Sequence, residues 1–467
     1  MNYQPVNFER IVMNLENIIN SQREFFLGNF TKSYDFRMRQ LDKLENAIRD
    51  NESLILDALR KDLGKSNFES YLTEYHFVLG EIKFAKKNLR KWMSKKRVKS
   101  SLTTLPAKSF YTYEPLGVTL IISPWNYPFN LSLGPVVGAI ASGNTVILKT
   151  SSKSTETSKI ISRIVGDNFR EEYFIHLDNE KLDYDELIHK PYDHVFYTGG
   201  PAVAKKIMAA QVPHLSKLTL ELGGKSPCLV EKTADIKMAA KEIAWAKTVN
   251  AGQTCIAPDF VIVDRKIKID LIKEIKLNLI NFYGENPFAN PDFPRIINEH
   301  HFVRLLGLID EDKVVFGGEF DEKLLKIGPT IMDEVDFSDP VMGEEIFGPI
   351  IPIISYDNLD EILGKIKMMP KPLAFYTFTR DKKIEDKIIR EIEYGNGAIN
   401  ECLMQIANPN LEFGGVGNSG QGGYHGYFGF MNFSNRKSIL KAGIFDNFLK
   451  YPPYTDKKLK FIKKILG

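Results

Sequence analysis

The sequence predicts an α/β protein with two parallel sheets, each covered by helices. From residue 118 onward, short β-branched runs alternate with amphipathic helical segments, which is typical of parallel sheets wrapped on both faces. The alternation starts again after Gly224, so we expect a second α/β domain to begin there and to run to about residue 398. The length of 467 residues also favours two or three domains over one.

The first hundred residues are predicted to be helical. Apolar residues between Arg37 and Lys65 recur at three- and four-residue steps, and Gly64 is a suitable helix end. Further helices are expected over residues 154–165, over residues 202–210 and from residue 236, where Asp235 is a candidate cap.

The strand candidates are short apolar runs rich in β-branched and aromatic residues. In the first α/β domain they cover residues 118–123, 145–149, 173–177, 194–198 and 217–222. In the second they cover residues 260–264 and 373–378. A glycine-dense stretch follows over residues 413–429, and a proline pair at 452–453 precedes the C-terminal tail.

Composition argues against several classes of function. The 62 basic and 59 acidic side chains leave a net charge of +3, which is no footprint for nucleic acid. Neither an apolar signal core nor a membrane-spanning apolar run is found, and three scattered cysteines fit neither a disulfide framework nor a zinc site. His300 and His301 are adjacent, whereas metal ligands on a helix need a spacing of three or four. We therefore predict a soluble, cytoplasmic protein without a metal.

The tail over residues 449–467 contains a predicted basic amphipathic helix. Its apolar residues are Leu459, Ile462, Ile465 and Leu466, and lysines fill the positions between them. Such a helix can lie on an anionic membrane surface. Packing against the chain's own body or a partner subunit is the favoured interpretation, and peripheral membrane contact is the alternative.

Four segments contain reactive residue types in settings that packing alone explains poorly. Asn126 follows a strand in "SPWNYPF", and Glu221 ends a strand in "LELGGKSP". Cys255 lies in "NAGQTCIAPD", which predicts a polar, flexible loop, although a packing cysteine usually lies among apolar residues. Glu345 and Phe347 precede a Gly-Pro turn in "EEIFGP".

Together, these groups suffice for acyl chemistry. The thiolate of Cys255 can add to a carbonyl and create an oxyanion. The Asn126 amide and the Cys255 backbone N–H can hold that oxyanion, and one such donor is worth about 3 kcal/mol in the transition state. Glu221 can then activate water as a general base. These residues leave open whether the acyl donor is an ester or an aldehyde.

The chain resembles the aldehyde dehydrogenases, and within them the class 3 branch that acts on fatty and aromatic aldehydes. Five segments match in order across nearly the whole chain: "PWNYPF", "LELGGKSPC", "NAGQTCIAPD", "EEIFGPI" and "FGGVGNSGQGGYHG". The resemblance implies two Rossmann-like domains, one for cofactor and one catalytic, with a small β oligomerisation arm. It also implies oxidation of medium- or long-chain aliphatic or aromatic aldehydes to carboxylic acids, with NAD or NADP as the hydride acceptor.

The resemblance also assigns roles to residues. It implies that Cys255 is the nucleophile, that Asn126 is the oxyanion amide and that Glu221 activates the deacylating water. Hydride transfer from a thiohemiacetal on Cys255 would leave a thioester for that water to hydrolyse. The expected cofactor contacts come from Lys149 at the adenosine ribose, Glu345 at the nicotinamide ribose, Phe347 at the nicotinamide ring, and from Trp125, Ser152, Gly199 and Gly200.

The implied domain division follows the same resemblance. Residues 1–105 and 117–223 form the NAD(P)-binding domain, and residues 224–397 form the catalytic domain. Residues 106–116 and 398–448 form the oligomerisation arm, and the basic tail follows. A homodimer is expected.

Four positions depart from the family pattern. Gly200 replaces a common serine and Ala204 a common glycine in the phosphate-binding turn. Ser152, followed by Lys153, replaces a glutamate that NAD-preferring members use at the adenosine ribose. Losing that carboxylate removes repulsion toward a 2′-phosphate, so we predict that both NADP and NAD are accepted. Gln405 stands where class 3 members often have histidine, near the expected substrate entrance.

Other functions fit part of the pattern. A CoA-acylating variant would transfer the acyl group to CoA, but Glu221 favours hydrolysis. A thiol esterase would use Cys255 and Asn126 without a cofactor. A non-catalytic binding protein on the same fold is disfavoured by the intact set of reactive residues.

Overall fold

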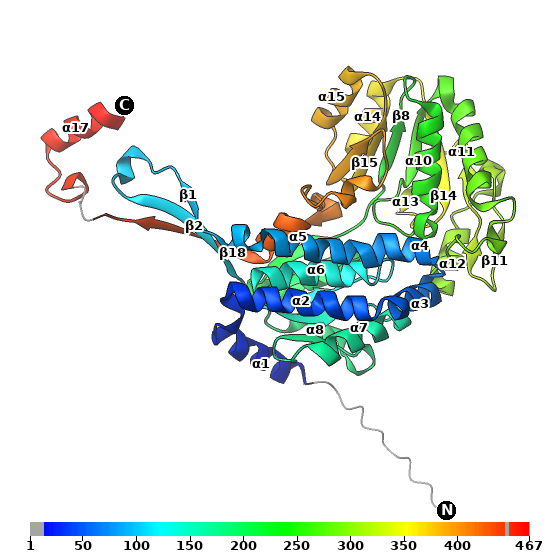
Figure 1. The fold of residues 1–467 in the computed structure, drawn as a ribbon. Coiled ribbons are helices and arrows are strands. Elements are labelled where there is room, and N and C mark those ends of the chain that lie inside the picture. Colours follow the sequence, from blue (N-terminus) through cyan, green and yellow to red (C-terminus); the bar gives the residue numbers. More distant parts are fainter. Residues whose placement is uncertain (1–13, 444–447, 467) are drawn as a thin grey trace, which may run out of the picture.

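The computed structural model describes residues 14–443 and 448–466 of the chain. Helices fill most of the first hundred residues, as predicted (Figure 1). They are α1 (Leu15–Leu27), α2 (Tyr34–Asp50), α3 (Glu52–Leu63), α4 (Asn67–Ser70) and α5 (His76–Met93), with a π-helical turn at Tyr71–Tyr75. Gly64 ends α3 in the left-handed conformation that glycine adopts without strain, with a φ of 70°.

The first sheet has six strands in the order β17-β7-β6-β3-β4-β5. All five strands predicted before residue 224 are present: β3 (Val118–Ile122), β4 (Thr145–Lys149), β5 (Phe174–His176), β6 (His194–Thr198) and β7 (Lys217–Glu221). These strands run parallel, while β17 (Gly420–Gln421) joins β7 antiparallel. The accompanying helices are α6 (Asn130–Ser142), α7 (Thr155–Asn168), α8 (Tyr184–His189) and α9 (Pro201–Gln211).

Alternate residues of β3 enter two different cores. Val118, Leu120 and Ile122 pack in a cluster with residues of α1, α8 and α9. Ile121 packs on the opposite face, in a cluster with residues of α2, α5 and α6. Because both faces of the strand are buried, its sequence is apolar almost throughout.

The second sheet has seven strands in the order β10-β13-β14-β9-β8-β15-β16. The predicted strands appear as β9 (Phe260–Asp264) and β15 (Ala374–Phe378). The others are β8 (Pro227–Val230), β10 (Val314–Phe316), β13 (Thr330–Met332), β14 (Ile350–Tyr356) and β16 (Asn396–Ile399), and β11 (Phe320–Asp321) pairs separately with β12 (Lys326–Ile327). The helices are α10 (Ile236–Thr248), α11 (Lys268–Tyr283), α12 (Glu299–Leu306), α13 (Pro340–Gly343), α14 (Leu359–Met368) and α15 (Lys382–Glu391).

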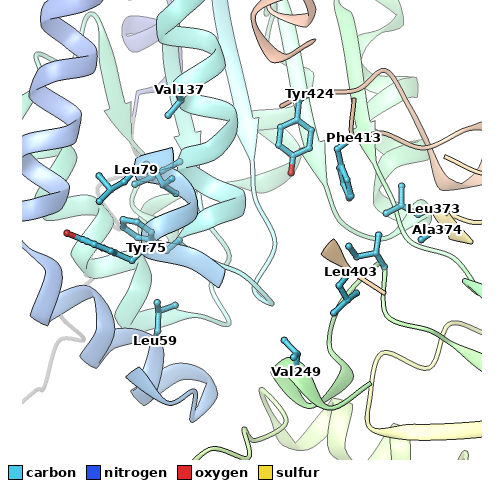
Figure 2. Close-up of a cluster of buried hydrophobic side chains, with 14 of the residues drawn as sticks. Leu59, Tyr75, Leu79, Val137, Val249, Leu373, Ala374, Leu403, Phe413 and Tyr424 are labelled. Atoms are coloured by element: carbon cyan, nitrogen blue, oxygen red, sulfur yellow. The ribbon is translucent and has the colours of Figure 1, made fainter. Parts of the chain in front are cut away.

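One apolar core continues from the first sheet into the second. The cluster that contains Ile121 also contains Val261 of β9 and Tyr376 of β15. Figure 2 shows part of it, with Leu59, Tyr75 and Leu79 on one side and Leu373, Ala374 and Leu403 on the other. Val249, just before the cysteine loop, belongs to the same cluster. The loop therefore rests on packing shared by both sheets.

A third, three-stranded sheet extends away from the body of the molecule (Figure 1). It consists of β1 (Lys96–Val98), β2 (Lys108–Pro115) and β18 (Ser434–Lys441), and α16 (Gly426–Asn432) leads into β18. The predicted tail helix is present as α17 (Asp456–Leu466) and lies near the tip of this sheet (Figure 1). None of its described side chains is buried, so packing of this helix against the chain's own body, one of the predicted environments, was wrong. Within residues 14–443 and 448–466, no helix is long and apolar enough to cross a bilayer.

Candidate active site

A crevice for a dinucleotide is expected where the order of the first sheet reverses. β4 and β5 follow β3 on one side, and the chain then crosses to the other side of β3 for β6 and β7. In open α/β sheets, ligands bind outside the carboxyl ends of the strands at such a switch point. Trp125 and Asn126 follow β3 at this edge, Lys149 ends β4, and Gly199 and Gly200 follow β6. The topology thus brings the predicted cofactor residues to one edge of the sheet.

Cys255 lies between the end of α10 and the start of β9, in a loop that is buried rather than open. The predicted flexible polar setting was wrong, because Asn250 and Gln253 are fully buried and Cys255 is only partly exposed. Hydrogen bonds replace solvent around the loop: the Tyr127 hydroxyl bonds to Thr254 Oγ1 at 2.7 Å. The polar residues hold the loop in place, and they were mistaken for a sign of exposure.

Asn126 reaches directly into the cysteine loop. Its side-chain Nδ2 donates to the carbonyl of Gln253 at 3.0 Å. Its own backbone carbonyl accepts from Asn250 Nδ2 at 2.7 Å. The amide is therefore bonded to the residue two positions before Cys255, close to where an oxyanion would form on a Cys255 adduct.

Glu221 ends β7 and is 2% exposed. Among the described residues, neither of its carboxylate oxygens has a hydrogen-bond partner. Burial raises the pKa of Glu221 well above its usual range, and Glu412 adds a smaller repulsion. Gly420 pairs with Glu221 along β17, so the glycine-dense stretch borders the strand end that carries this residue. An unpaired buried carboxyl group is a candidate acid or base.

The Cys255 thiol lies within electrostatic reach of two carboxyl groups. Burial raises its pKa above the ordinary value, and Glu345 and Glu221 raise it further. The backbone N–H groups of Cys255 and Ile256 act in the opposite direction. The raised pKa favours the neutral thiol in the free protein, so a nucleophilic role would require the thiolate to form once the site is occupied.

Glu345 lies against the backbone of the Gly223–Gly224 turn. A Cβ at Gly223 would collide with the Glu345 carboxylate, so a side chain there would require that carboxylate to move. Burial raises its pKa to about 8, and Asp259 adds to this. Lys225 fastens the same loop, because its Nζ donates to Asp259 at 2.5 Å and to the Glu344 carbonyl at 2.9 Å.

The adenosine side of the crevice contains Lys149 and the start of α9. Burial lowers the pKa of Lys149, and its ammonium group lies 5.4 Å from the centre of the Tyr184 ring. No described side chain caps the N-terminus of α9, which begins after Gly200. Uncapped N–H groups at a helix start are suited to phosphate. Ser152 lies in the exposed turn after β4 and carries no charge.

Aromatic rings line the crevice near Glu345. The Trp125 and Phe347 rings meet edge to face with centroids 5.3 Å apart. His301 lies 4.9 Å from Trp125, and Lys153 Nζ hydrogen-bonds His301 Nε2 at 2.9 Å. Burial lowers the pKa of His301 to about 4, so its neutral ring accepts from the lysine. These groups, the uncapped α9 and the Glu345 carboxylate fit a dinucleotide.

Sequence reasoning missed Tyr376, which connects the cysteine loop to Gln405. Gln405 donates to the hydroxyl of Tyr376, which in turn donates to the carbonyl of Ile256 beside the nucleophile. Cys228 and Cys402 are both buried. Among the described residues, no group of three or more His, Cys, Asp or Glu side chains could hold a metal ion. The hydrogen bonds of Gln405 and Tyr376 cannot be recognised from a local sequence pattern, because their partners lie far apart in the chain.

Comparison with known proteins decides the family. The model of the aldehyde dehydrogenase family matches residues 14–439. This chain belongs to the aldehyde dehydrogenase family. It is accordingly an oxidoreductase that acts on aldehydes. The class 3 resemblance is confirmed by curated relatives that are named as family 3 members. One of them, member H1 of Arabidopsis thaliana, is 40% identical over 96% of this chain and 94% of that protein.

Other relatives extend the comparison of this family member. It is 43% identical to the 4,4′-diaponeurosporen-aldehyde dehydrogenase of Staphylococcus aureus, over 94% of this chain and 96% of that protein. It is 41% identical to the mouse dimeric NADP-preferring aldehyde dehydrogenase, over 94% of this chain and 98% of that protein. A structure of Staphylococcus aureus AldH in a substrate-bound state superposes with a TM-score of 0.94 at 42% identity, covering 97% of this chain and all of that one. The predicted α/β fold of this family is thereby confirmed.

Proposed function

We propose that the protein oxidises aldehydes to carboxylic acids with NAD or NADP, through a thiohemiacetal and then a thioester on Cys255. The observation that carries the proposal is the meeting of three groups at the edge of a dinucleotide-type sheet. Asn126 bonds into the loop of Cys255, and the carboxyl group of Glu221 lies near enough to raise the pKa of the thiol. No packing role explains the unpartnered carboxyl group of Glu221.

Each group has one task in this proposal. The Cys255 thiolate adds to the aldehyde carbon, and the Asn126 amide donates to the resulting oxyanion. The dinucleotide supplies a hydride acceptor when it is bound. Glu221 takes a proton from the water that attacks the thioester carbon. The carbon–sulfur bond then breaks, the carboxylic acid leaves and the Cys255 thiolate is restored. Because Glu221 is buried without a partner, its carboxylate form is a stronger base than an exposed one.

Both coenzymes are proposed to bind. Ser152 presents no carboxylate against a 2′-phosphate, and Lys153 follows it in the same exposed turn. The relative named as NADP-preferring supports this proposal. Glu345, Phe347, Trp125 and Lys149 are the proposed contacts along the rest of the dinucleotide.

The proposed substrates are medium- or long-chain aliphatic aldehydes or aromatic aldehydes. Cys255 packs against an apolar cluster that includes Phe413, Leu403 and Val249 (Figure 2). The name of the Staphylococcus aureus relative specifies a diaponeurosporen aldehyde, which supports an apolar substrate. An apolar wall beside the nucleophile stabilises a long acyl chain by about 0.8 kcal/mol for each buried methylene.

A coenzyme comparison tests this function. The absorbance of reduced nicotinamide is followed with a medium-chain aldehyde and either NAD or NADP, in the absence of CoA. We expect absorbance to rise with both coenzymes. NADP at least about a hundredfold worse than NAD, a gap of about 3 kcal/mol, would contradict the coenzyme proposal. No rise with short, long or aromatic aldehydes would contradict the function itself.

Assembly as a homodimer is also proposed. It is supported by the extended sheet of β1, β2 and β18, in which β18 lies at an edge among the described strands. An open strand edge favours pairing with another chain. The domain boundaries and the cytoplasmic location stay predictions from the sequence.

A further inference from the structure

A fully buried ion pair lies beneath the proposed oxyanion amide. Lys65 Nζ and Glu74 Oε1 are 2.5 Å apart, and both side chains are 0% exposed. Lys65 follows the end of α3, and Glu74 lies in the π-helical turn Tyr71–Tyr75. Removing two charges from water costs several kcal/mol for each ion, and such a pair is no better for stability than apolar residues of the same volume. The pair therefore calls for a reason other than stability.

Each partner of the pair holds the backbone around Asn126. Lys65 Nζ donates to the Asn126 carbonyl at 3.2 Å and lies 4.0 Å from the centre of the Tyr127 ring. Glu74 Oε2 accepts from the backbone N–H of Phe129 at 2.8 Å and from that of Asn130 at 3.2 Å. The charged pair thus binds the residue with the amide and the first turn of α6, which follows it.

The same contacts continue into the loop of the nucleophile. The Asn126 carbonyl also accepts from Asn250 Nδ2, which donates in addition to the Gln253 carbonyl at 3.0 Å. The backbone N–H of Asn250 donates to Glu69 Oε1 at 2.8 Å. Asn250 has a φ of 54°, in the left-handed region that a non-glycine residue adopts only at a cost. Contacts from the same N-terminal segment hold both loops.

The π-helical turn explains how Glu74 reaches this position. One extra residue in a helical turn shifts the side chains after it around the helix axis, and such turns occur frequently at functional sites. Here the turn directs Glu74 inward to the start of α6, where a carboxylate also meets the positive end of the helix dipole.

We propose that Lys65 and Glu74 are positioning residues for the oxyanion amide of Asn126. By fixing the backbone on both sides of Tyr127 and Pro128, they hold the side-chain amide against the cysteine loop before substrate binds. The inference rests on the proposed function, because it assigns the two residues to the step in which an oxyanion forms on the Cys255 adduct. Displacing a reactive group by about 1 Å can cost a hundredfold in rate.

A double-mutant cycle with Asn126 tests this inference. Glu74→Gln, Asn126→Ala and the double variant are compared by the rate of the first turnover, with ordinary and 1-deuterated aldehyde. We expect Glu74→Gln to slow the first turnover about 10- to 100-fold, with an isotope effect at least as large as that of the wild type. In the Asn126→Ala protein, Glu74→Gln should add less than about threefold, because both changes act through the same amide.

Two further readouts separate positioning from a general loss of structure. Coenzyme affinity, from quenching of tryptophan fluorescence, should change less than about twofold in Glu74→Gln. Glu74→Asp keeps the charge but withdraws the carboxylate by one methylene, and it should have an intermediate first-turnover rate. The control pair is Lys268→Gln with Asp333→Asn, since Lys268 and Asp333 form a largely buried ion pair 3.0 Å apart outside the site. This control should leave the first turnover unchanged.

Several outcomes would overturn the inference. One is a Glu74→Gln protein with a lower melting temperature but a wild-type rate of the first turnover. Another is a double variant whose loss of rate equals the product of the two single-variant losses. If Glu74→Gln does not fold, the same cycle is run with Glu74→Asp. Additive free-energy losses from Glu74→Asp and Asn126→Ala would then also contradict the inference. The proposed function fails separately, through a wild-type protein that reduces neither coenzyme.

Discussion

Cys255 and Glu221 are two buried groups with proposed catalytic roles. Burial raises the pKa of each, and Glu221 raises that of the thiol further. A neutral thiol is slow to oxidise or to be alkylated, so the raised pKa protects Cys255 in the free protein. The proposed mechanism needs the thiolate only when substrate and coenzyme are bound, and Asn126 is already held beside the cysteine loop in the free protein.

Ser152 is the residue at which coenzyme choice can be changed. Ser152→Glu places a carboxylate in the exposed turn after β4, where it repels a 2′-phosphate and accepts hydrogen bonds from ribose hydroxyls. We expect the affinity for NADP to fall at least about tenfold, while NAD binding is retained or improved. Fluorescence titration with each coenzyme measures both constants. Ser151→Glu, one residue earlier in the same segment, is the control, and an equal loss in the two variants would contradict a specific role for Ser152.

Glu345 gives coenzyme binding a pH dependence. Burial raises its pKa to about 8, so the carboxyl group is mostly protonated at neutral pH and ionises as the pH rises through that value. Only the ionised form accepts hydrogen bonds from two ribose hydroxyls. Below pH 8, we therefore expect coenzyme affinity to increase by up to about tenfold for each unit by which the pH is raised.

The matched variant for this prediction is Glu345→Gln. Its amide does not titrate, so its coenzyme affinity should be lower and should lose the rise through pH 8. Fluorescence titration across the pH range measures both profiles. A rise that survives in Glu345→Gln would assign it to another group, such as Lys247, whose pKa burial lowers to about 8.

The sequence predicts candidate reactive residues, but it does not predict their surroundings. Asn126, Glu221 and Cys255 are uncommon residue types beside turns and strand ends, and the family resemblance assigned their roles. Lys65 lies 61 residues before Asn126, and no periodicity or spacing marks their contact. The polar sequence around Cys255 suggested exposure because hydrogen bonds to distant residues such as Tyr127 cannot be seen in a local pattern.

At the scale of elements, α7 depends on a cap from another helix. Asp62 in α3 accepts from the backbone N–H groups of Glu156 and Thr157, at 3.1 and 2.8 Å, and from the Thr157 hydroxyl at 2.7 Å. These groups form the first turn of α7, which follows the turn that contains Ser152. The cap thus fastens the proposed adenosine side of the crevice to the N-terminal helices.

Asp62→Ala should destabilise the protein by about 1 to 3 kcal/mol, because it leaves the first N–H groups of α7 buried and unpaired. Urea denaturation measures the change in the free energy of unfolding. The control is Asp235→Ala, which removes a more exposed cap of α10 that accepts from Met238 N at 3.2 Å. A smaller loss of unfolding free energy in Asp62→Ala than in Asp235→Ala would contradict the importance of the buried cap.

Strands that are apolar and free of proline were predicted with nearly correct ends. The predicted strand over 194–198 matches β6, and that over 145–149 matches β4. β8 begins with Pro227 and β14 contains Pro352, and proline argues against an interior strand because it cannot donate to the ladder. Both strands nevertheless lie inside the second sheet, since packing on both faces outweighs one missing hydrogen bond.

At the scale of the whole molecule, one core joins the two α/β units, while the three-stranded sheet extends away from them (Figure 1). We expect two chains to associate through this sheet, so sedimentation velocity should give the mass of a dimer. Leu440 in β18 is 56% exposed, and Leu440→Lys should weaken the dimer at least about tenfold by placing a charge in an apolar contact. The control is Met368→Lys, because the Met368 side chain in α14 is exposed and lies outside this sheet. A monomeric wild-type protein would contradict the dimer.

The most direct test of Cys255 as the nucleophile and Glu221 as the deacylating base is to trap the acyl group. Glu221→Gln keeps the shape of the side chain but cannot accept a proton, so steady-state turnover should fall about 10²- to 10⁴-fold. We expect one equivalent of reduced coenzyme to form quickly, and mass spectrometry of the digested protein to find the acyl group of the aldehyde on the peptide that contains Cys255. An adduct on another residue, or full turnover without any adduct, would contradict the mechanism.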